Sequence, residues 1–201
     1  MRWRTGRKSR NIEDRRGLKF SRRTKGSGLG IIVLALVALY FGVDPAIILQ
    51  GIPTETVTPT QAPPHDRSPE EDRLAEFVSV VLADTEDTWH ALFSKDGMTY
   101  EEPVLVLFSG AVQSACGFAR AAMGPFYCPA DKKVYIDLSF YDDLRSRHGA
   151  PGDFAQAYVV AHEIGHHVQN LLGISHRVHT ARQRAGNIQA NRLSVMQELQ
   201  A

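Results

Sequence analysis

The stretch A-Y-V-V-A-H-E-I-G-H-H-V-Q occupies residues 157–169 and contains the pattern H-E-I-G-H. Apolar residues recur around it at helical spacing and predict a helix that begins near Asp153 and stops at Gly173. Residues four apart on a helix project from the same face, so the imidazoles of His162 and His166 can reach one ion. A zinc–nitrogen distance of about 2.0–2.1 Å is compatible with this placement.

Glu163 lies about 100° around that helix from His162. There it can accept a proton from a metal-bound water without being a ligand, while zinc polarises a peptide carbonyl. The bare pattern also occurs in ordinary helices, but three features favour a metal site here: the amphipathic helix, a preceding strand, and Gly165, which permits close backbone approach. The pattern therefore indicates metal ligands His162 and His166 and a catalytic Glu163.

Upstream patterns predict the rest of the domain. Ser68 has the N-cap position of a helix, with Pro69 at its first position and Glu71 three residues after the cap. The run V-L-V-L-F at 104–108 predicts a buried strand, and V-Y-I-D-L-S-F at 134–140 a half-exposed one. The second strand either forms a cleft edge that pairs with substrate or is an ordinary sheet strand. We expect an α+β, zincin-like fold with a small sheet packed on the H-E-x-x-H helix.

Charge is distributed unevenly along the chain. The net charge is +1, yet the first 25 residues hold 11 Lys or Arg. The apolar run 29–43 follows, so the positive-inside rule predicts a basic cytoplasmic arm (1–25), one transmembrane helix (26–43), a Pro/Thr-rich linker (44–67) and a metallopeptidase domain outside (68–201). A cleaved signal peptide or a buried helix are the alternatives to an anchor. The arm could also bind nucleic acid, but its position favours the membrane, and we expect no nucleic-acid partner.

The chain contains two cysteines, Cys116 and Cys128. An even count downstream of an export signal is compatible with one disulfide in an oxidising compartment. The alternative is a pair of buried free thiols. A separation of 12 residues is too wide for a C-x-x-C redox or zinc-ribbon spacing.

Several segments together resemble the bacterial family of putative neutral zinc metallopeptidases. They are G-P-F-Y-C-P-A-D-K-K-V-Y-I-D-L-S-F-Y at 124–141, the H-E-I-G-H stretch at 157–169, S-A-C-G at 114–117 and E-L-Q-A at 198–201. The resemblance implies a zinc-dependent hydrolase in which His162 and His166 bind the metal and Glu163 is catalytic. It also implies that the family's sequence continues past E-L-Q-A, so that the domain at 68–201 is incomplete.

A catalytic zinc takes three protein ligands, so two histidines are not enough. The metzincin pattern is absent, because Gln169 and Leu172 occupy its Gly and third His positions. His176 and His179 lie just beyond the Gly173 stop, where a turn could return one of them to the metal. They are the second choice for the third ligand.

Glu198 is the first choice. Its surroundings have apolar residues at helical spacing: Leu193, Met196 and Leu199. A second helix packed on the first can present a carboxylate to the metal, and the resemblance at E-L-Q-A points to the same residue. The alternative is a solvated glutamate near a frayed chain end. The residue that stabilises the transition state has only weak candidates, among them Tyr158.

These patterns predict a membrane-anchored zinc metallopeptidase that hydrolyses peptide bonds in a peptide or protein substrate, with Zn²⁺ as its cofactor. It is expected to be a single-pass protein of the cell membrane, with a cytoplasmic N-terminus and an extracytoplasmic catalytic domain. Two alternatives are an anchored, non-catalytic interaction protein with a protease-like fold, and a structural metal site. Structural zinc sites are usually closed by four ligands and rich in cysteine, which does not fit this ligand set.

Overall fold

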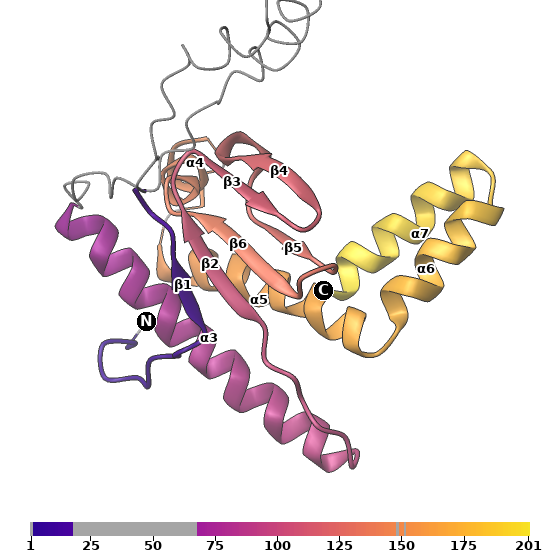
Figure 1. Ribbon diagram of the computed structural model, residues 1–201, viewed down its shortest axis with the longest axis horizontal. Helices are drawn as coiled ribbons and strands as arrows, with labels where there is room; N and C mark the ends of the chain where they lie inside the picture. Colours follow the sequence, from indigo (N-terminus) through magenta and orange to yellow (C-terminus); the bar gives the residue numbers. More distant parts are fainter. Residues whose placement is uncertain (1, 18–67, 148, 151) are drawn as a thin grey trace, which may run out of the picture. The chain divides into compact units, whose positions relative to one another are not determined.

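A four-stranded sheet in the order β1-β2-β6-β5 organises the computed structural model of this protein (Figure 1). At its centre β2 (Val104–Phe108) and β6 (Lys133–Asp137) pair in parallel. One edge is β1 (Ile12–Asp14), parallel to β2, and the other is β5 (Phe126–Cys128), antiparallel to β6. The structure describes residues 2–17, 68–147, 149–150 and 152–201.

Two long helices accompany this sheet, α3 (Pro69–Lys95) and α5 (Asp153–Leu171). The capping box predicted for α3 is confirmed: the Ser68 hydroxyl accepts from the Glu71 N–H at 3.1 Å, and the Glu71 carboxylate accepts from the Ser68 N–H at 3.0 Å. These two bonds satisfy backbone groups that a helix start otherwise leaves unpaired. The cap fixes the start of α3 at Ser68.

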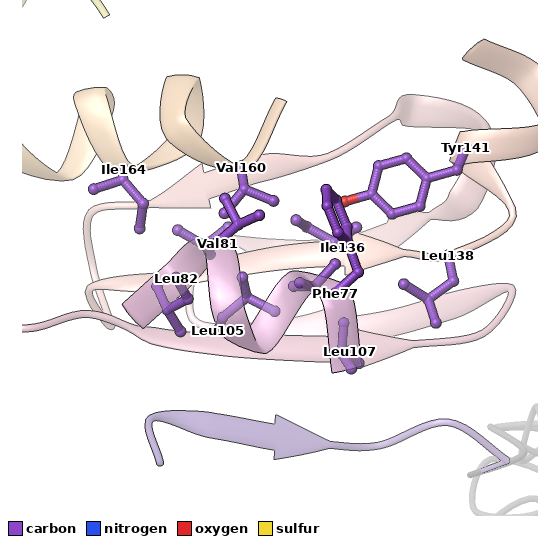
Figure 2. Close-up of a cluster of buried hydrophobic side chains, with 12 residues drawn as sticks. Phe77, Val81, Leu82, Leu105, Leu107, Ile136, Leu138, Tyr141, Val160 and Ile164 are labelled. Carbon is purple, nitrogen blue, oxygen red and sulfur yellow. The ribbon is translucent and has the colours of Figure 1, made fainter. Parts of the chain in front are cut away.

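The main core lies between these helices and one face of the sheet (Figure 2). Alternate strand residues point to opposite faces, so β2 sends Leu105 and Leu107 toward the helices and Val106 and Phe108 to the other side. Each fully buried side chain of this size contributes about 1.5–3 kcal/mol. The helix side of the core also contains Phe77, Val81 and Leu82 from α3, Ile136 from β6, and Val160 and Ile164 from α5.

A hairpin of β3 (Ala111–Ser114) and β4 (Gly117–Arg120) contributes to the core on the opposite sheet face. A short 3-10 turn, η1 (Ala121–Met123), leads from it to β5. The disulfide expected from the sequence is present and joins Cys116 at the hairpin tip to Cys128 at the end of β5, with an S–S distance of 2.04 Å. The hairpin is therefore tied covalently to an edge strand.

Three further helices complete the described chain: α4 (Phe140–Ser146), α6 (Ile174–Arg184) and α7 (Asn187–Gln200). Helices α6 and α7 pack on each other as a hairpin (Figure 1). The chain enters α6 through Gly173 with a φ of 68°, a left-handed conformation that glycine adopts without cost. The hairpin returns the end of α7 to α5. The described residues thus have the mixed α+β class expected from the sequence.

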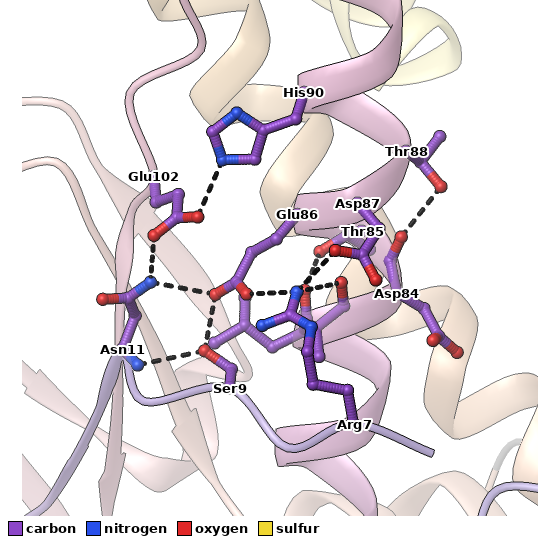
Figure 3. A network of polar contacts seen from close by, with 12 residues as sticks. Arg7, Ser9, Asn11, Asp84, Thr85, Glu86, Asp87, Thr88, His90 and Glu102 are labelled. Carbon is purple, nitrogen blue, oxygen red and sulfur yellow. Dashed lines mark hydrogen bonds and ion pairs between the residues drawn. The ribbon is translucent and has the colours of Figure 1, made fainter.

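The N-terminal segment packs against α3 through a buried polar network (Figure 3). At its centre is the carboxylate of Glu86, which is 1% exposed. It accepts hydrogen bonds from Ser9, from Asn11 at 2.9 Å and from Arg7 at 2.9 Å. The Ser9 N–H also donates to the Ser79 carbonyl at 3.0 Å. Burying a carboxylate is costly unless it is paired and hydrogen-bonded. The three partners therefore offset the free-energy cost of burying the Glu86 carboxylate.

The single-pass membrane location expected from the sequence is corrected. In the described part of the chain, no helix combines the length and the apolar character needed to cross a membrane. The expected span (26–43) and linker (44–67) lie outside the described residues. Moreover, β1 from the expected cytoplasmic arm shares a sheet with β2 from the expected outside domain, and a single crossing would place these paired strands on opposite sides.

Candidate metal centre

Three potential ligands meet where α7 returns to α5. His162 and His166 lie one turn apart on α5, with ring centroids 4.7 Å apart. The Glu198 Oε2 atom of α7 is 3.3 Å from His162 Nε2 and 3.2 Å from His166 Nε2. One ligand atom from each residue lies within 4.8 Å of the others. Within the described residues this group includes neither His176 nor His179, both of which are exposed on α6.

These distances suit a shared metal ion. Ligands about 2.0–2.1 Å from a tetrahedral zinc lie roughly 3.3–3.4 Å from one another. The two separations from Glu198 Oε2 to the histidine nitrogens, 3.2 and 3.3 Å, agree with that edge length, and the whole set lies within 4.8 Å. Two imidazole nitrogens and one carboxylate also form a donor set typical of catalytic zinc, which leaves a position open for water. The residues present therefore fit the metal that the sequence pattern predicts.

The two histidines differ in how their second ring nitrogen is held. His166 Nδ1 lies 3.1 Å from the Gln169 side-chain oxygen. His162 Nδ1 is buried and has no hydrogen-bond partner among the described residues. The ring of Tyr158 stacks near His162, with centroids 6.1 Å apart and an interplanar angle of 21°. Metal-bound histidines almost always donate their other N–H to an acceptor, which makes the Gln169 contact informative.

Glu163 is buried beside this group, with 7% of its surface exposed. Burial raises the pKa of its carboxyl to about 7, the nearby Glu198 raises it too, and His166 and a backbone hydrogen bond from Tyr127 oppose the shift. A base with a pKa near neutrality is well matched to proton transfer at neutral pH. Glu163 therefore lies beside the three potential ligands, with a pKa suited to proton transfer at neutral pH.

Two side-chain contacts to Tyr127 fasten the edge strand β5 to α5, and a third ties α5 to the segment before β2. His167, the residue after His166, is fully buried. Its Nε2 lies 2.7 Å from the Glu101 carbonyl, and its Nδ1 lies 3.0 Å from the Tyr127 hydroxyl. Asn170 donates to the same hydroxyl at 3.1 Å. Burial lowers the pKa of His167, so the neutral ring is favoured and one nitrogen can accept.

A polar cavity of about 440 Å³ opens at the metal group. Its wall includes β5, which is the edge strand of the sheet on this side. The strand expected at 134–140 as a possible cleft edge ends at Asp137 and lies inside the sheet, paired on both sides. The cavity is lined by Pro125, Phe126, Tyr127, Pro129, His162, Glu163, His166, Ser175, Arg182, Gln197 and Glu198.

Sequence patterns alone give no role to Tyr127, Arg182 or Gln169. Tyr127 lies in the segment 124–141 that carries the family resemblance, Arg182 lies in a segment without a motif, and only the folded chain brings them to the cavity. Gln169 stands out in the sequence merely as a departure from the metzincin pattern. Its position three residues after His166 is the one available signal, because side chains at that spacing meet on a helix.

The family model described as Putative neutral zinc metallopeptidase matches residues 1–201. The chain belongs to this family. It is 49% identical over 210 residues to the uncharacterized protein YpfJ of Escherichia coli K12, covering 100% of this chain and 72% of that protein. It is 39% identical over 155 residues to the uncharacterized protein Rv2575 of Mycobacterium tuberculosis H37Rv, covering 74% of this chain and 51% of that protein. No solved structure is detectably similar.

Proposed function

We propose that this protein is a zinc-dependent metallopeptidase in which His162, His166 and Glu198 hold the ion and Glu163 is the general base. The observation that carries the proposal is the convergence of three suitable ligand atoms within 4.8 Å, next to a buried carboxylate. Family membership supports the same reading. A binding protein would gain nothing from a buried base at this place.

A zinc ion bound at this group would supply a Lewis acid that polarises the scissile carbonyl and acidifies water. Glu163 takes a proton from the water that attacks the carbonyl carbon and later delivers it to the leaving amine. The water oxygen stays on the new carboxyl group, and the peptide C–N bond breaks. Because burial favours the protonated carboxyl, Glu163 can hold the proton between the two transfers.

The cavity wall provides means to bind a peptide. As an edge strand, β5 can pair through its outer backbone groups with an extended substrate. Arg182 lines the same cavity, and its positive charge can stabilise the negative charge that develops on the carbonyl oxygen. The polar lining leaves room for varied side chains, so we propose peptides or proteins as the substrate class.

The test is Glu163→Gln in the full chain, with Glu70→Gln at the exposed start of α3 as control. The Gln side chain keeps the shape but cannot accept the proton. Bound zinc, measured by mass spectrometry, should stay at the wild-type ratio, while hydrolysis of a quenched fluorescent peptide library falls about 10²–10⁴-fold. Turnover close to wild type in this variant would refute the mechanism.

Ligand assignments are tested in the same preparation. Zinc content should fall strongly in Glu198→Ala and stay unchanged in His176→Ala. The reverse pattern would identify the histidine as the third ligand. A wild-type chain that holds zinc but cleaves no peptide would instead favour a non-catalytic interaction protein.

A further inference from the structure

Gln169 connects two parts of the candidate metal centre through a single side chain. It lies on α5 three residues after His166 and is 3% exposed. Its amide oxygen is 3.1 Å from His166 Nδ1. Its amide nitrogen donates to the Gln197 carbonyl at 2.8 Å and to the Gln200 side-chain oxygen at 3.1 Å, both on α7.

The chemistry of these partners fixes which way the amide points. A backbone carbonyl can only accept a hydrogen bond, so the Gln169 nitrogen must face Gln197. The Gln169 oxygen is then left for His166 and can only accept. His166 must therefore carry a proton on Nδ1, which leaves Nε2 as the ring nitrogen available to the ion.

The α7 side of this connection matters because the helix packs on α6 without burying any of its own side chains. No side chain of this fully described helix is buried, and the Glu198 side chain is 61% exposed. The Gln197 carbonyl belongs to the residue immediately before Glu198. A hydrogen bond to that carbonyl from a buried amide is thus a direct restraint on where the Glu198 side chain starts.

We propose that Gln169 is a positioning residue that couples two metal ligands. Through its oxygen it holds the His166 ring in the tautomer that binds metal, and through its nitrogen it holds α7 so that Glu198 reaches the ion. The proposal rests on the metal assignment in the proposed function. Its two contacts can nevertheless be measured in the metal-free protein.

Two variants of the full chain separate the contacts. Gln169→Leu has nearly the same size and removes both. Gln169→Glu keeps an acceptor for His166 Nδ1 but cannot donate to the Gln197 carbonyl. The control is Gln183→Leu on α6, whose exposed amide lies 2.9 Å from His179 Nε2, away from α5.

In the metal-free protein, imidazole nitrogen shifts report the His166 tautomer and hydrogen exchange reports the stability of α7. Gln169→Leu should lose the Nδ1–H preference and exchange its α7 amides at least tenfold faster. Gln169→Glu should keep the tautomer and show the same faster exchange. Gln183→Leu should resemble wild type in both measurements.

With zinc as the probe and a chelator as competitor, Gln169→Leu should bind about 10–100-fold more weakly. Wild-type α7 protection in both Gln169 variants would overturn the proposal, as would an unchanged tautomer and zinc affinity in Gln169→Leu. If the wild-type chain binds no zinc, the proposed function fails, while the metal-free measurements still decide whether Gln169 couples the two elements.

Discussion

Replacing Gly165 by alanine sets two physical effects against each other at the metal centre. Gly165 is the fourth residue of H-E-I-G-H, and the end of α7 lies directly over it. A Cβ added there would be 2.7 Å from the Ala201 carbonyl carbon and 2.8 Å from the Ala201 Cα. Both are backbone atoms, which cannot rotate away as a flexible side chain could.

The size of the disturbance follows from these distances. Ordinary contact begins near 3.4 Å, so the end of α7 must retreat by about 0.7 Å, the difference between 3.4 and 2.7 Å. Metal–ligand distances tolerate deviations of only about 0.2 Å. We therefore expect Glu198 to be drawn out of position and zinc affinity to fall about 10–100-fold, equivalent to about 1.4–2.8 kcal/mol.

Helix propensity acts in the opposite direction. Alanine is favoured over glycine inside a helix by about 0.8–1 kcal/mol. The metal-free Gly165→Ala protein should therefore be about as stable to urea as the metal-free wild type. The gain in helix propensity offsets the packing that the variant loses against α7. Weaker metal binding without a matching loss of metal-free stability is the expected signature.

Zinc affinity is measured by competition with a chelating dye, and metal-free stability by urea denaturation followed by circular dichroism. Gly186→Ala is the control, because a Cβ at Gly186 meets no atom within 4 Å and its φ is −68°. In a Glu198→Ala background, Gly165→Ala should cause no further loss of affinity. Wild-type zinc affinity in the single variant would refute the link between this close approach and the third ligand.

Three further changes test the fold. Leu82→Ala in the core should cost about 2–5 kcal/mol in urea denaturation, whereas Leu92→Ala, at a position 40% exposed, should cost on the order of 1 kcal/mol. Ser9→Ala removes a hydrogen bond to the buried Glu86 carboxylate and should cost about 1.5–3 kcal/mol by the same assay; a change below 0.5 kcal/mol would contradict the network. Cys116→Ser opens the 12-residue loop and should cost about 3 kcal/mol, a loss that dithiothreitol should reproduce in the wild-type chain and not increase in the variant.

The features that the sequence predicted correctly are those formed by residues close together in the chain. The capping box at Ser68 and Glu71 and the strand at 104–108 occur where the sequence placed them. The four-residue spacing of His162 and His166 put both rings on one side of α5. Each of these features depends on residues a few positions apart, so a pattern in the chain is enough to indicate it.

Features that depend on distant partners were not predictable in this way. The three residues of β1 lie among arginines with no alternating pattern, and they form a strand because β2 offers a partner much later in the chain, while Glu86 holds Ser9 just before them. The sequence indicated a helical segment around Glu198, yet only the folded α6–α7 hairpin brings it to α5. Gln169 acquires its contacts through the same return of the chain.

The pairing of β1 with β2 also sets an order of events during folding. Leu105 meets Val134 across 29 residues, but Ile12 meets Leu105 across 93. Closing the longer loop costs about 1 kcal/mol more in chain entropy, so β1 is expected to join last. Until then the outer edge of V-L-V-L-F is an unpaired apolar strand, the kind of edge through which chains aggregate. A recombinant chain that starts at Ser68 would leave this edge of β2 unpaired. The N-terminal residues therefore protect the protein against self-association through that edge.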